Sequence, residues 1–147
     1  MEEKMKKLCL SLLLCCFALT LAAAPKNWLT DLDDALQTAK KQRKPVLILI
    51  TGSDWCPPCK KLYRDVLETK DFKKFARKNL VLLYVDSPRR PSPADRQLLS
   101  EVQNKYGRAR GVPHTILLDS DGNMIQQFSG YRADYKNQVE KIIRKAK

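Results

Sequence analysis

Two cysteines three positions apart, Cys56 and Cys59, are the residues of this sequence whose types and spacing best suit chemistry. They stand in the stretch Trp55-Cys56-Pro57-Pro58-Cys59. Three residues make about one helical turn, which brings two cysteines close enough to close a short disulfide. Such a pair can cycle between dithiol and disulfide, and so exchange electrons with another disulfide. A C-x-x-C motif alone is a weak signal, so the elements on either side of it decide what it indicates.

The sequence around the cysteines predicts a strand-to-helix turn. Upstream, residues 46–50 (VLILI) form a continuous aliphatic run, typical of a strand buried on both faces. Downstream, Leu62 and Val66 recur four positions apart, which is the spacing of one helix face. Cys56 then lies near the helix N-terminus, where unpaired N–H groups, the helix dipole and exposure at the turn favour a reactive thiolate. Pro57 suits the first helical turn because its φ angle is already helical.

Length and charge limit the possible functions. The chain has 147 residues, enough for one domain with a hydrophobic core, and carries a formal net charge of +12. Its lysines and arginines are spread over the whole length, and aromatic residues do not alternate with them as base stacking would require. We therefore expect solvated helix faces and no nucleic-acid partner, with only a weak general attraction to acidic partners or anionic lipid.

The first 24 residues have the pattern of an export signal. A basic start is followed by the apolar residues 8–21 and by the small residues 22–24, which suit cleavage. The alternative is an uncleaved membrane anchor, because the apolar residues 8–24 are only just long enough to span a bilayer. We favour cleavage, which predicts a signal peptide at 1–24 and one domain at 25–147.

The export signal changes the interpretation of the cysteines. Cys9, Cys15 and Cys16 lie in the apolar segment, where cysteine behaves as a small hydrophobic residue. The mature chain keeps only Cys56 and Cys59. One closely spaced pair cannot supply the disulfide framework of a small secreted protein. The pair is therefore expected to react rather than to hold the fold together.

The rest of the chain predicts alternating helices and strands. The first is a helix with Leu32, Leu36 and Ala39 at helical spacing, which Pro45 ends. After it come the strand at 46–50, a helix after the cysteines that continues or restarts at Asp71, a strand at 80–85, a proline-rich loop at 87–93, a helix at 94–106, a strand at 114–118, a turn at 119–122, a strand at 123–128 and a helix at 133–145. The first two strands are predicted to be parallel neighbours joined by a right-handed crossover. The proline-rich loop then emerges at the same sheet edge as the cysteines.

This order of elements, with Trp-Cys-x-x-Cys at a helix start and Val112-Pro113 before a hairpin, resembles the thioredoxin superfamily. The resemblance covers the chain from about Trp28 to the C-terminus. It implies an α/β, thioredoxin-like fold with a central mixed β-sheet flanked by helices. The stretch 51–56 (TGSDWC), the export signal and the solitary cysteine pair are most similar to small periplasmic thiol-disulfide reductases of the DsbH type.

The resemblance also implies roles for individual residues. Cys56 matches the attacking cysteine and Cys59 the resolving one, while Pro113 matches a cis-proline that lies against the disulfide. The implied substrate groove comprises Trp55, Pro57, Pro58, Val112 and Pro113. The expected partners are disulfide-containing protein substrates and a membrane electron donor of the DsbD type. We expect a periplasmic monomer that needs no cofactor and no metal.

Two departures from the thioredoxin pattern matter. Thioredoxins carry a buried acid six positions before the first cysteine, which assists proton transfer at the resolving thiol. Here that position is Ile50, and the candidates to replace the acid are Asp54 and water. The dipeptide Pro57-Pro58 lacks the histidine that stabilises the thiolate in strong oxidases of the superfamily. Its absence favours a disulfide reductase, with a disulfide oxidase or isomerase as the alternative.

Two other classes of function stay open at this point. In a metal-binding module, Cys56 and Cys59 would be two ligands and His114 a third, although the sequence has no second C-x-x-C. In a non-catalytic binding module of the cell envelope, the same pair would form a structural disulfide.

Overall fold

The structure, a computed structural model, describes residues 24–146. The predicted signal peptide at 1–24 therefore lies outside the described residues, except for Ala24. Within the described part of the chain, none of the helices combines the length and the apolar character needed to cross a bilayer.

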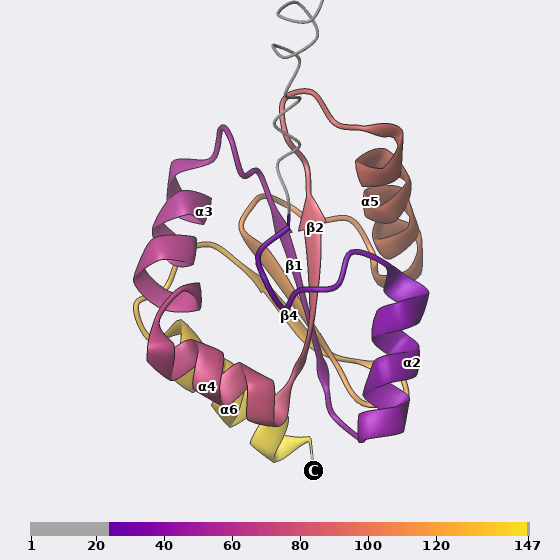
Figure 1. The fold of residues 1–147 in the computed structure, drawn as a ribbon, viewed down its shortest axis with the longest axis vertical. Coiled ribbons are helices and arrows are strands. Elements are labelled where there is room, and N and C mark those ends of the chain that lie inside the picture. The colour runs from indigo at the N-terminus through magenta and orange to yellow at the C-terminus, as the bar shows by residue number, and fades with distance from the viewer. Residues whose placement is uncertain (1–23, 147) are drawn as a thin grey trace, which may run out of the picture.

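Helices cover both faces of a four-stranded sheet (Figure 1). The sheet consists of β1 (Val46–Thr51), β2 (Val81–Asp86), β3 (His114–Leu118) and β4 (Met124–Ser129), in the order β2-β1-β3-β4. Helices α2 (Leu32–Gln42) and α5 (Pro93–Tyr106) lie on one face, and α3 (Pro57–Leu62), α4 (Lys70–Asn79) and α6 (Tyr135–Lys145) lie on the other. The π-helical turn η1 (Tyr63–Leu67) connects α3 to α4. The predicted mixed sheet flanked by helices is confirmed.

The strand pairing determines which loops meet. Strand β1 is parallel to β2, with Thr51 opposite Asp86 at the end of both strands. It is antiparallel to β3, which in turn pairs with β4 as a hairpin. Because the carboxyl ends of parallel strands lie at the same edge of a sheet, the turn that carries the cysteines and the loop that follows β2 emerge side by side. Both predictions, the parallel pair and the shared edge, are confirmed.

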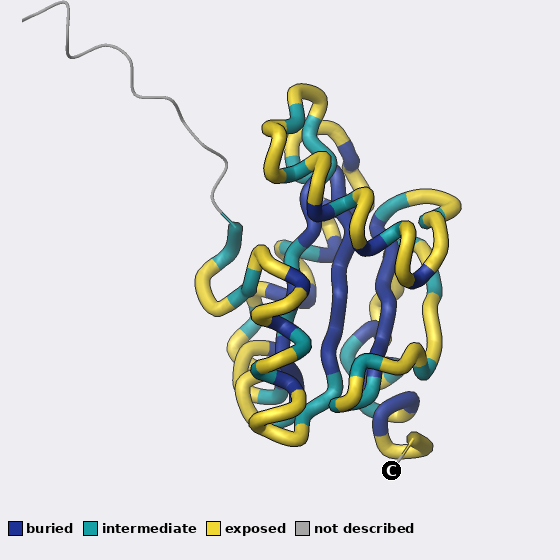
Figure 2. Tube along the Cα trace, turned by 90° about the vertical axis from the view of Figure 1, so that its right-hand side faces the viewer, coloured by how far each residue is buried: buried dark blue, intermediate teal, exposed yellow. Residues whose placement is uncertain are grey.

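Strand β1 is the centre of the core. Its alternate side chains enter two apolar clusters, Ile48 and Ile50 on the side of α2 and α5, and Leu47 and Leu49 on the side of α4 and α6. Figure 2 shows the strands as the buried interior beneath exposed helix surfaces. Burial of an aliphatic side chain of this size contributes about 1.5–3 kcal/mol, so a strand with two buried faces favours the uninterrupted aliphatic run seen in the sequence.

Side-chain caps place the starts of α4 and α5 one residue earlier than predicted. Helix α5 begins at Pro93 because Ser92 and Asp95 form a capping box, in which Ser92 Oγ accepts a hydrogen bond from Asp95 N at 3.1 Å. Helix α4 begins at Lys70 because Thr69 Oγ accepts a hydrogen bond from Phe72 N at 3.2 Å. These caps end the preceding segments and set where each helix starts.

Candidate active site

Cys56 and Cys59 form a disulfide, with their Cα atoms 5.2 Å apart. Both residues are buried, with exposed fractions of only 2% and 4%. The prediction that Cys56 is exposed at the turn is therefore wrong for this oxidised form. The cause is the segment before β3, whose Val112 carbonyl oxygen lies 3.7 Å from Cys56 Sγ. The two cysteines are about equally buried, but Cys56 faces the Val112 carbonyl oxygen and Cys59 lines a cavity.

The start of α3 positions Cys56. Cys56 is the N-cap residue, and Pro57 and Pro58 occupy the first helical turn, as the sequence predicted for Pro57. Cys59 N donates a hydrogen bond to Cys56 Sγ at 3.2 Å, so a backbone N–H at the helix N-terminus faces this sulfur atom. In the reduced protein the same N–H would stabilise negative charge on Cys56, which favours its thiolate.

Trp55 is fixed against the loop that follows β2. Its indole Nε1 donates a hydrogen bond to the carbonyl oxygen of Ser87 at 2.7 Å, while 41% of the residue stays exposed. The ring lies directly over Gly52, where an added Cβ atom would come within 2.6 Å of Trp55 Nε1. A side chain at position 52 would therefore overlap the indole ring of Trp55. Sequence analysis missed Gly52 and Ser87, because neither belongs to the C-x-x-C motif.

The segment before β3 closes the other side of the site. The Val112–Pro113 peptide bond is cis, as the resemblance implied. Pro113 is buried and its carbonyl oxygen accepts a hydrogen bond from Gly130 N at 2.8 Å, while Val112 remains half-buried next to Cys56. Pro57 and Pro58, in the first turn of α3, are exposed. The structure thus places the residues of the predicted groove around Cys56.

Comparison with known proteins agrees with this geometry. A family model described as thioredoxin-like matches residues 27–120. The chain belongs to the thioredoxin-like family. It is 30% identical over 129 residues to the disulfide bond reductase DsbH of Chlamydia pneumoniae, an alignment that covers 84% of this chain and 76% of that protein. A solved structure described as DsbH oxidoreductase superposes with a TM-score of 0.70 at 29% identity, covering 85% of this chain and 89% of the other.

Two further matches add detail. The thioredoxin-related protein DsbJ of Chlamydia pneumoniae is 30% identical over 106 residues, which cover 71% of this chain but 30% of DsbJ. A thioredoxin from Thermus thermophilus superposes with a TM-score of 0.63 at 17% identity, covering 81% of this chain and 88% of that one, a likeness of fold. With the Cys56–Cys59 disulfide in place, this thioredoxin-like protein is a DsbH-like thiol-disulfide oxidoreductase.

The position of the thioredoxin acid is apolar in this thioredoxin-like domain. Ile50 is 1% exposed and belongs to the apolar cluster under α2 and α5. Asp54, one of the two predicted replacements, is exposed, and both of its carboxylate oxygens accept hydrogen bonds from Arg89 N at 3.2 Å. Asp54 thus connects the cysteine turn to the loop after β2.

A different carboxylate lies at the end of β2. Asp86 is only 9% exposed and holds Ser53 with both oxygens: Oδ1 accepts a hydrogen bond from Ser53 N at 3.0 Å, and Oδ2 accepts one from Ser53 Oγ at 2.5 Å. Sequence analysis missed this pair. The signal that could have found it is position, since Asp86 ends the second of two predicted parallel strands and so reaches the cysteine edge.

A cavity of about 290 Å³ lies behind Cys59. It is lined by Pro25, Leu49, Thr51, Ser53, Cys59, Lys60, Tyr63 and Tyr84. Burial, with a smaller effect of the hydrogen bond to Glu68, raises the pKa of Tyr63 to about 12. Burial and then the negative charge of Asp86 raise the pKa of Tyr84. Both phenols therefore stay neutral near pH 7, and the cavity wall next to Cys59 is rich in hydroxyl groups.

His114, the third ligand of the metal-binding alternative, is engaged elsewhere. Its Nδ1 lies 2.7 Å from Ser129 Oγ and its Nε2 lies 3.1 Å from Gln127 Oε1, both on β4. Among the residues that the structure describes, no group of three His, Cys, Asp or Glu side chains is arranged to hold a metal ion. The geometry gives the metal-binding alternative no support.

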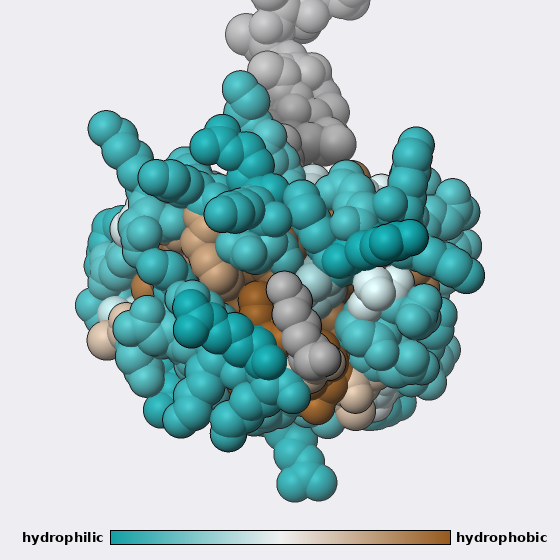
Figure 3. Space-filling model, turned by 90° about the horizontal axis from the view of Figure 1, so that it is seen from below, coloured by the Kyte–Doolittle hydropathy of each residue, from teal (hydrophilic) through white to brown (hydrophobic). Residues whose placement is uncertain are grey.

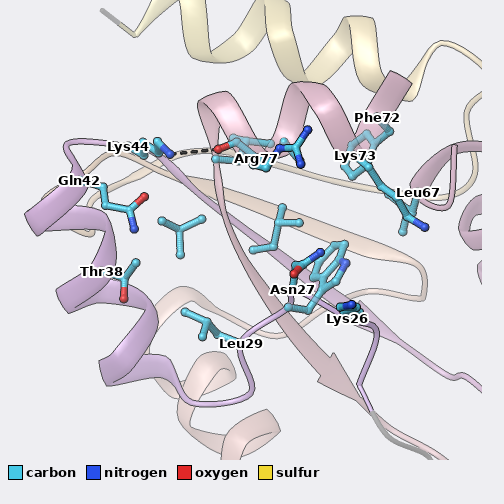
Figure 4. A pocket seen from close by; sticks show the side chains of 15 residues that line it. Lys26, Asn27, Leu29, Thr38, Gln42, Lys44, Leu67, Phe72, Lys73 and Arg77 are labelled. Atoms are coloured by element: carbon cyan, nitrogen blue, oxygen red, sulfur yellow. Dashed lines mark hydrogen bonds between the residues drawn. The ribbon is translucent and has the colours of Figure 1, made fainter. Parts of the chain in front are cut away.

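A larger cavity of about 440 Å³ lies away from the cysteines (Figure 4). It opens between α2, α4 and the start of β2, where Lys44 Nζ donates a hydrogen bond to the carbonyl oxygen of Arg77 at 3.0 Å. Figure 3 shows apolar surface surrounded by hydrophilic side chains at the end of the molecule where β1 and β2 begin. The lining combines four cations with apolar side chains and contains no cysteine: Lys26, Asn27, Trp28, Leu29, Thr38, Gln42, Lys44, Leu67, Phe72, Lys73, Ala76, Arg77, Leu80, Val81 and Leu82.

Proposed function

We propose that this protein is a periplasmic disulfide reductase, which opens disulfide bonds in envelope or secreted proteins. The observation that carries the proposal is the single C-x-x-C pair at the N-terminus of α3, with Cys59 N directed at Cys56 Sγ and no histidine between the cysteines. Without that histidine the dithiol form has no unusual stabilisation, so the pair gives up electrons readily. The printed name of its relative DsbH, a disulfide bond reductase, supports the same direction.

The reaction consists of two thiol–disulfide exchanges. In the reduced protein, the Cys56 thiolate attacks one sulfur atom of a substrate disulfide, and the other substrate sulfur leaves as a thiolate. Cys59, as thiolate, then attacks Cys56 Sγ, which breaks the mixed disulfide and releases the second substrate thiolate. Two electrons have passed to the substrate, and the protein holds the Cys56–Cys59 disulfide seen in the structure.

The groove around Cys56 would orient the substrate. Val112, next to Cys56 Sγ, and the exposed face of Trp55 border the sulfur atom that forms the mixed disulfide. The hydrogen bond from Trp55 to Ser87 keeps the indole ring in place while a substrate chain docks. Orientation of this kind brings the two reacting sulfur atoms into line before exchange.

Location and electron supply complete the proposal. The apolar residues 8–21 after a basic start support cleavage of a signal peptide at 1–24 and release of the domain at 25–147 into the periplasm. A bacterial periplasm has no glutathione-like buffer, so a dithiol carrier in the inner membrane, of the DsbD type, must return two electrons to the oxidised pair. The domain is proposed to act as a monomer on folded or partly folded proteins that carry disulfides.

The reduction potential tests the proposal. The mature domain is equilibrated in glutathione and dithiothreitol buffers, and the dithiol fraction is read by alkylation. We expect a potential nearer to the roughly −270 mV of thioredoxin than to the roughly −120 mV of the oxidase DsbA. A value above about −180 mV, the range of protein disulfide isomerase, would show that the protein is an isomerase or an oxidase instead.

A further inference from the structure

Release of substrate requires that the Cys59 thiol lose its proton, since only a thiolate attacks the mixed disulfide. Cys59 is 4% exposed, so bulk water has little direct access to it. Ile50, below the cysteines, belongs to an apolar cluster and cannot accept a proton. We propose that Asp86, acting through Ser53 and water in the cavity behind Cys59, accepts the proton that leaves the Cys59 thiol. The inference rests on the proposed order of attack, in which Cys59 is the resolving cysteine.

The cavity behind Cys59 provides the path for the proton from Cys59 to Ser53. It is about 290 Å³ in volume, several times the roughly 30 Å³ that one water molecule occupies in the liquid. Cys59 forms one part of its wall and Ser53 another, and Thr51, Tyr63 and Tyr84, which all carry hydroxyl groups, also line it. Polar groups of this number give water molecules the hydrogen-bond partners that they need in a partly enclosed space. Water in this cavity therefore connects Cys59 Sγ with Ser53 Oγ.

Asp86 is suited to receive the proton. Its Oδ2 is 2.5 Å from Ser53 Oγ, a distance typical of a strong hydrogen bond to an ionised carboxylate. None of the ion pairs within the described residues includes Asp86, so its carboxylate oxygens are not held by a cationic side chain there. When water gives a proton to Ser53 Oγ, the Ser53 hydroxyl can pass its own proton to Oδ2. The carboxylate thus gains the proton that Cys59 loses.

The other ionisable groups at the cavity do not replace it. Tyr63, with its pKa raised to about 12 by burial, and Tyr84, whose pKa is also raised by burial, are phenols that donate hydrogen bonds near pH 7. Lys60 Nζ donates to the carbonyl oxygen of Asp54 at 2.9 Å and carries a positive charge. Glu68, which does not line the cavity, is paired with Lys73 Nζ at 2.7 Å, and the hydrogen bond from Lys73 lowers its pKa.

The remaining carboxylate at this edge, Asp54, points at Arg89 N on the surface. No Asp or Glu lines the cavity among the residues that the structure describes, so the route through Ser53 leads to Asp86.

In this step, one proton transfer from Cys59 accompanies one thiol–disulfide exchange. The Cys59 proton moves through water and Ser53 to Asp86, and the Cys59 thiolate forms a bond with Cys56 Sγ. The bond between Cys56 Sγ and the substrate sulfur breaks, and that sulfur leaves with the electron pair. Asp86 then returns its proton to solvent or to the leaving thiolate. The Cys56 attack on substrate uses none of these groups.

A two-phase reaction isolates the step. Reduced protein is mixed with excess dithiobis-nitrobenzoate, an aromatic disulfide that releases a coloured thiolate. The first release depends on reagent concentration and reports attack by Cys56. The second is independent of reagent concentration and reports attack by Cys59 on the mixed disulfide. Both rates are measured in stopped flow between about pH 5 and pH 10, a range that spans the ordinary thiol pKa of about 8.5.

We expect Asp86→Asn to slow the second phase by roughly 10- to 100-fold near pH 6, which reaches the lower end of the roughly 100- to 10,000-fold typical of general base catalysis, and to leave the first phase unchanged. At alkaline pH, where the thiol ionises without help, its second phase should converge with that of the wild type. Ser53→Ala should behave in the same way, and Ser53→Thr, which keeps the hydroxyl, should restore the rate. The matched control is Asp119→Asn, which alters a carboxylate that accepts two backbone hydrogen bonds at 2.9 Å in the β3–β4 turn.

The result that overturns the inference is a second phase unchanged in both Asp86→Asn and Ser53→Ala, or one slowed equally at every pH, which would indicate a structural role. If Asp86→Asn does not fold, the Ser53 variants decide the matter alone. The reductase proposal is tested separately by the reduction potential, because the second phase reports attack by Cys59 whichever direction the protein works in the cell.

Discussion

A cavity lies at each end of the parallel pair β1 and β2, and the smaller of the two is the one next to the disulfide. Where both strands end, a cavity of about 290 Å³ is lined by a cysteine of the disulfide and by hydroxyl-bearing residues, one of which, Ser53, is hydrogen-bonded to the buried carboxylate of Asp86. Where β2 begins, a cavity of about 440 Å³ is lined by four cations and by apolar side chains without a cysteine. The larger and more positive cavity is thus not the reactive one.

The difference shows what a redox site requires in this fold. At the reactive end, the sulfur atom of Cys56 meets a backbone N–H at a helix start, and loops after two parallel strands bring partners to it. At the other end, α2 and α4 pack beside the edge strand β2, and Lys44 and Arg77 line the cavity together with apolar side chains. The end with the cysteines stabilises negative charge on a sulfur atom, whereas the end where β2 begins contributes packing.

The largest effect on activity is expected from substitution of the cysteines, and none is expected from a substitution at the larger cavity. Cys56→Ser should abolish disulfide reduction, whereas Cys59→Ser should accumulate mixed disulfides with substrate, because the attacking thiolate remains and the resolving one is lost. Arg77→Ala, at the other cavity, should keep full activity. The measurement is turnover of a model disulfide protein together with non-reducing gels. Mixed disulfides formed by the Cys56→Ser protein would reverse the assignment of the two cysteines.

The second prediction concerns packing at the larger cavity. Phe72 is 1% exposed, lines that cavity and packs against Tyr135 with ring centroids 6.3 Å apart. Phe72→Ala should lower the free energy of unfolding by about 3–5 kcal/mol, since it removes a buried ring and leaves a void. The reduction potential should not move. A shifted reduction potential with intact stability would mean that the two ends of the parallel pair are coupled.

The smallest effect is expected at the edge of the reactive end. Gly52→Ala would place a Cβ atom within 2.6 Å of Trp55 Nε1, which displaces the ring and breaks its hydrogen bond to Ser87. A hydrogen bond of this kind contributes about 0.5–1.5 kcal/mol, so substrate attack should slow by a few fold.

Indole fluorescence and the rate of attack on a peptide disulfide measure this change. Trp55→Phe, which loses the hydrogen bond without the overlap, is the matched comparison and should show a similar loss. An unchanged rate in both variants would show that the anchored ring does not orient the substrate.

Much of the site follows from local patterns. The aliphatic run at 46–50, the proline after Cys56 and the spacing of Leu62 and Val66 predicted a buried strand, a turn and a helix start, and the structure confirms each of them. The parallel pairing of the first two strands was also predictable, because a strand–helix–strand unit has few alternatives. These signals depend on residues within one or two turns of each other.

The contacts between the cysteine turn and distant parts of the chain were not predictable in this way. Ser53 and Asp86 are 33 positions apart, Trp55 and Ser87 are 32 apart, and Cys56 and Val112 are 56 apart. A pattern of apolar residues shows that two strands are neighbours, but the residue opposite Thr51 depends on the register that packing selects. For the same reason, the sequence suggested an exposed Cys56, and the chain around Val112 covers it.

By itself, the sequence determined the redox pair and the strand and helix that carry it, because backbone propensity, proline geometry and burial of apolar side chains act between near neighbours. Tertiary structure alone decided which groups surround that pair: the carboxylate that holds Ser53, the carbonyl oxygen beside Cys56 and the backbone oxygen that anchors Trp55. These contacts join segments far apart in the chain, and they exist only once the parallel strands have taken their register and the loops at their ends have packed together.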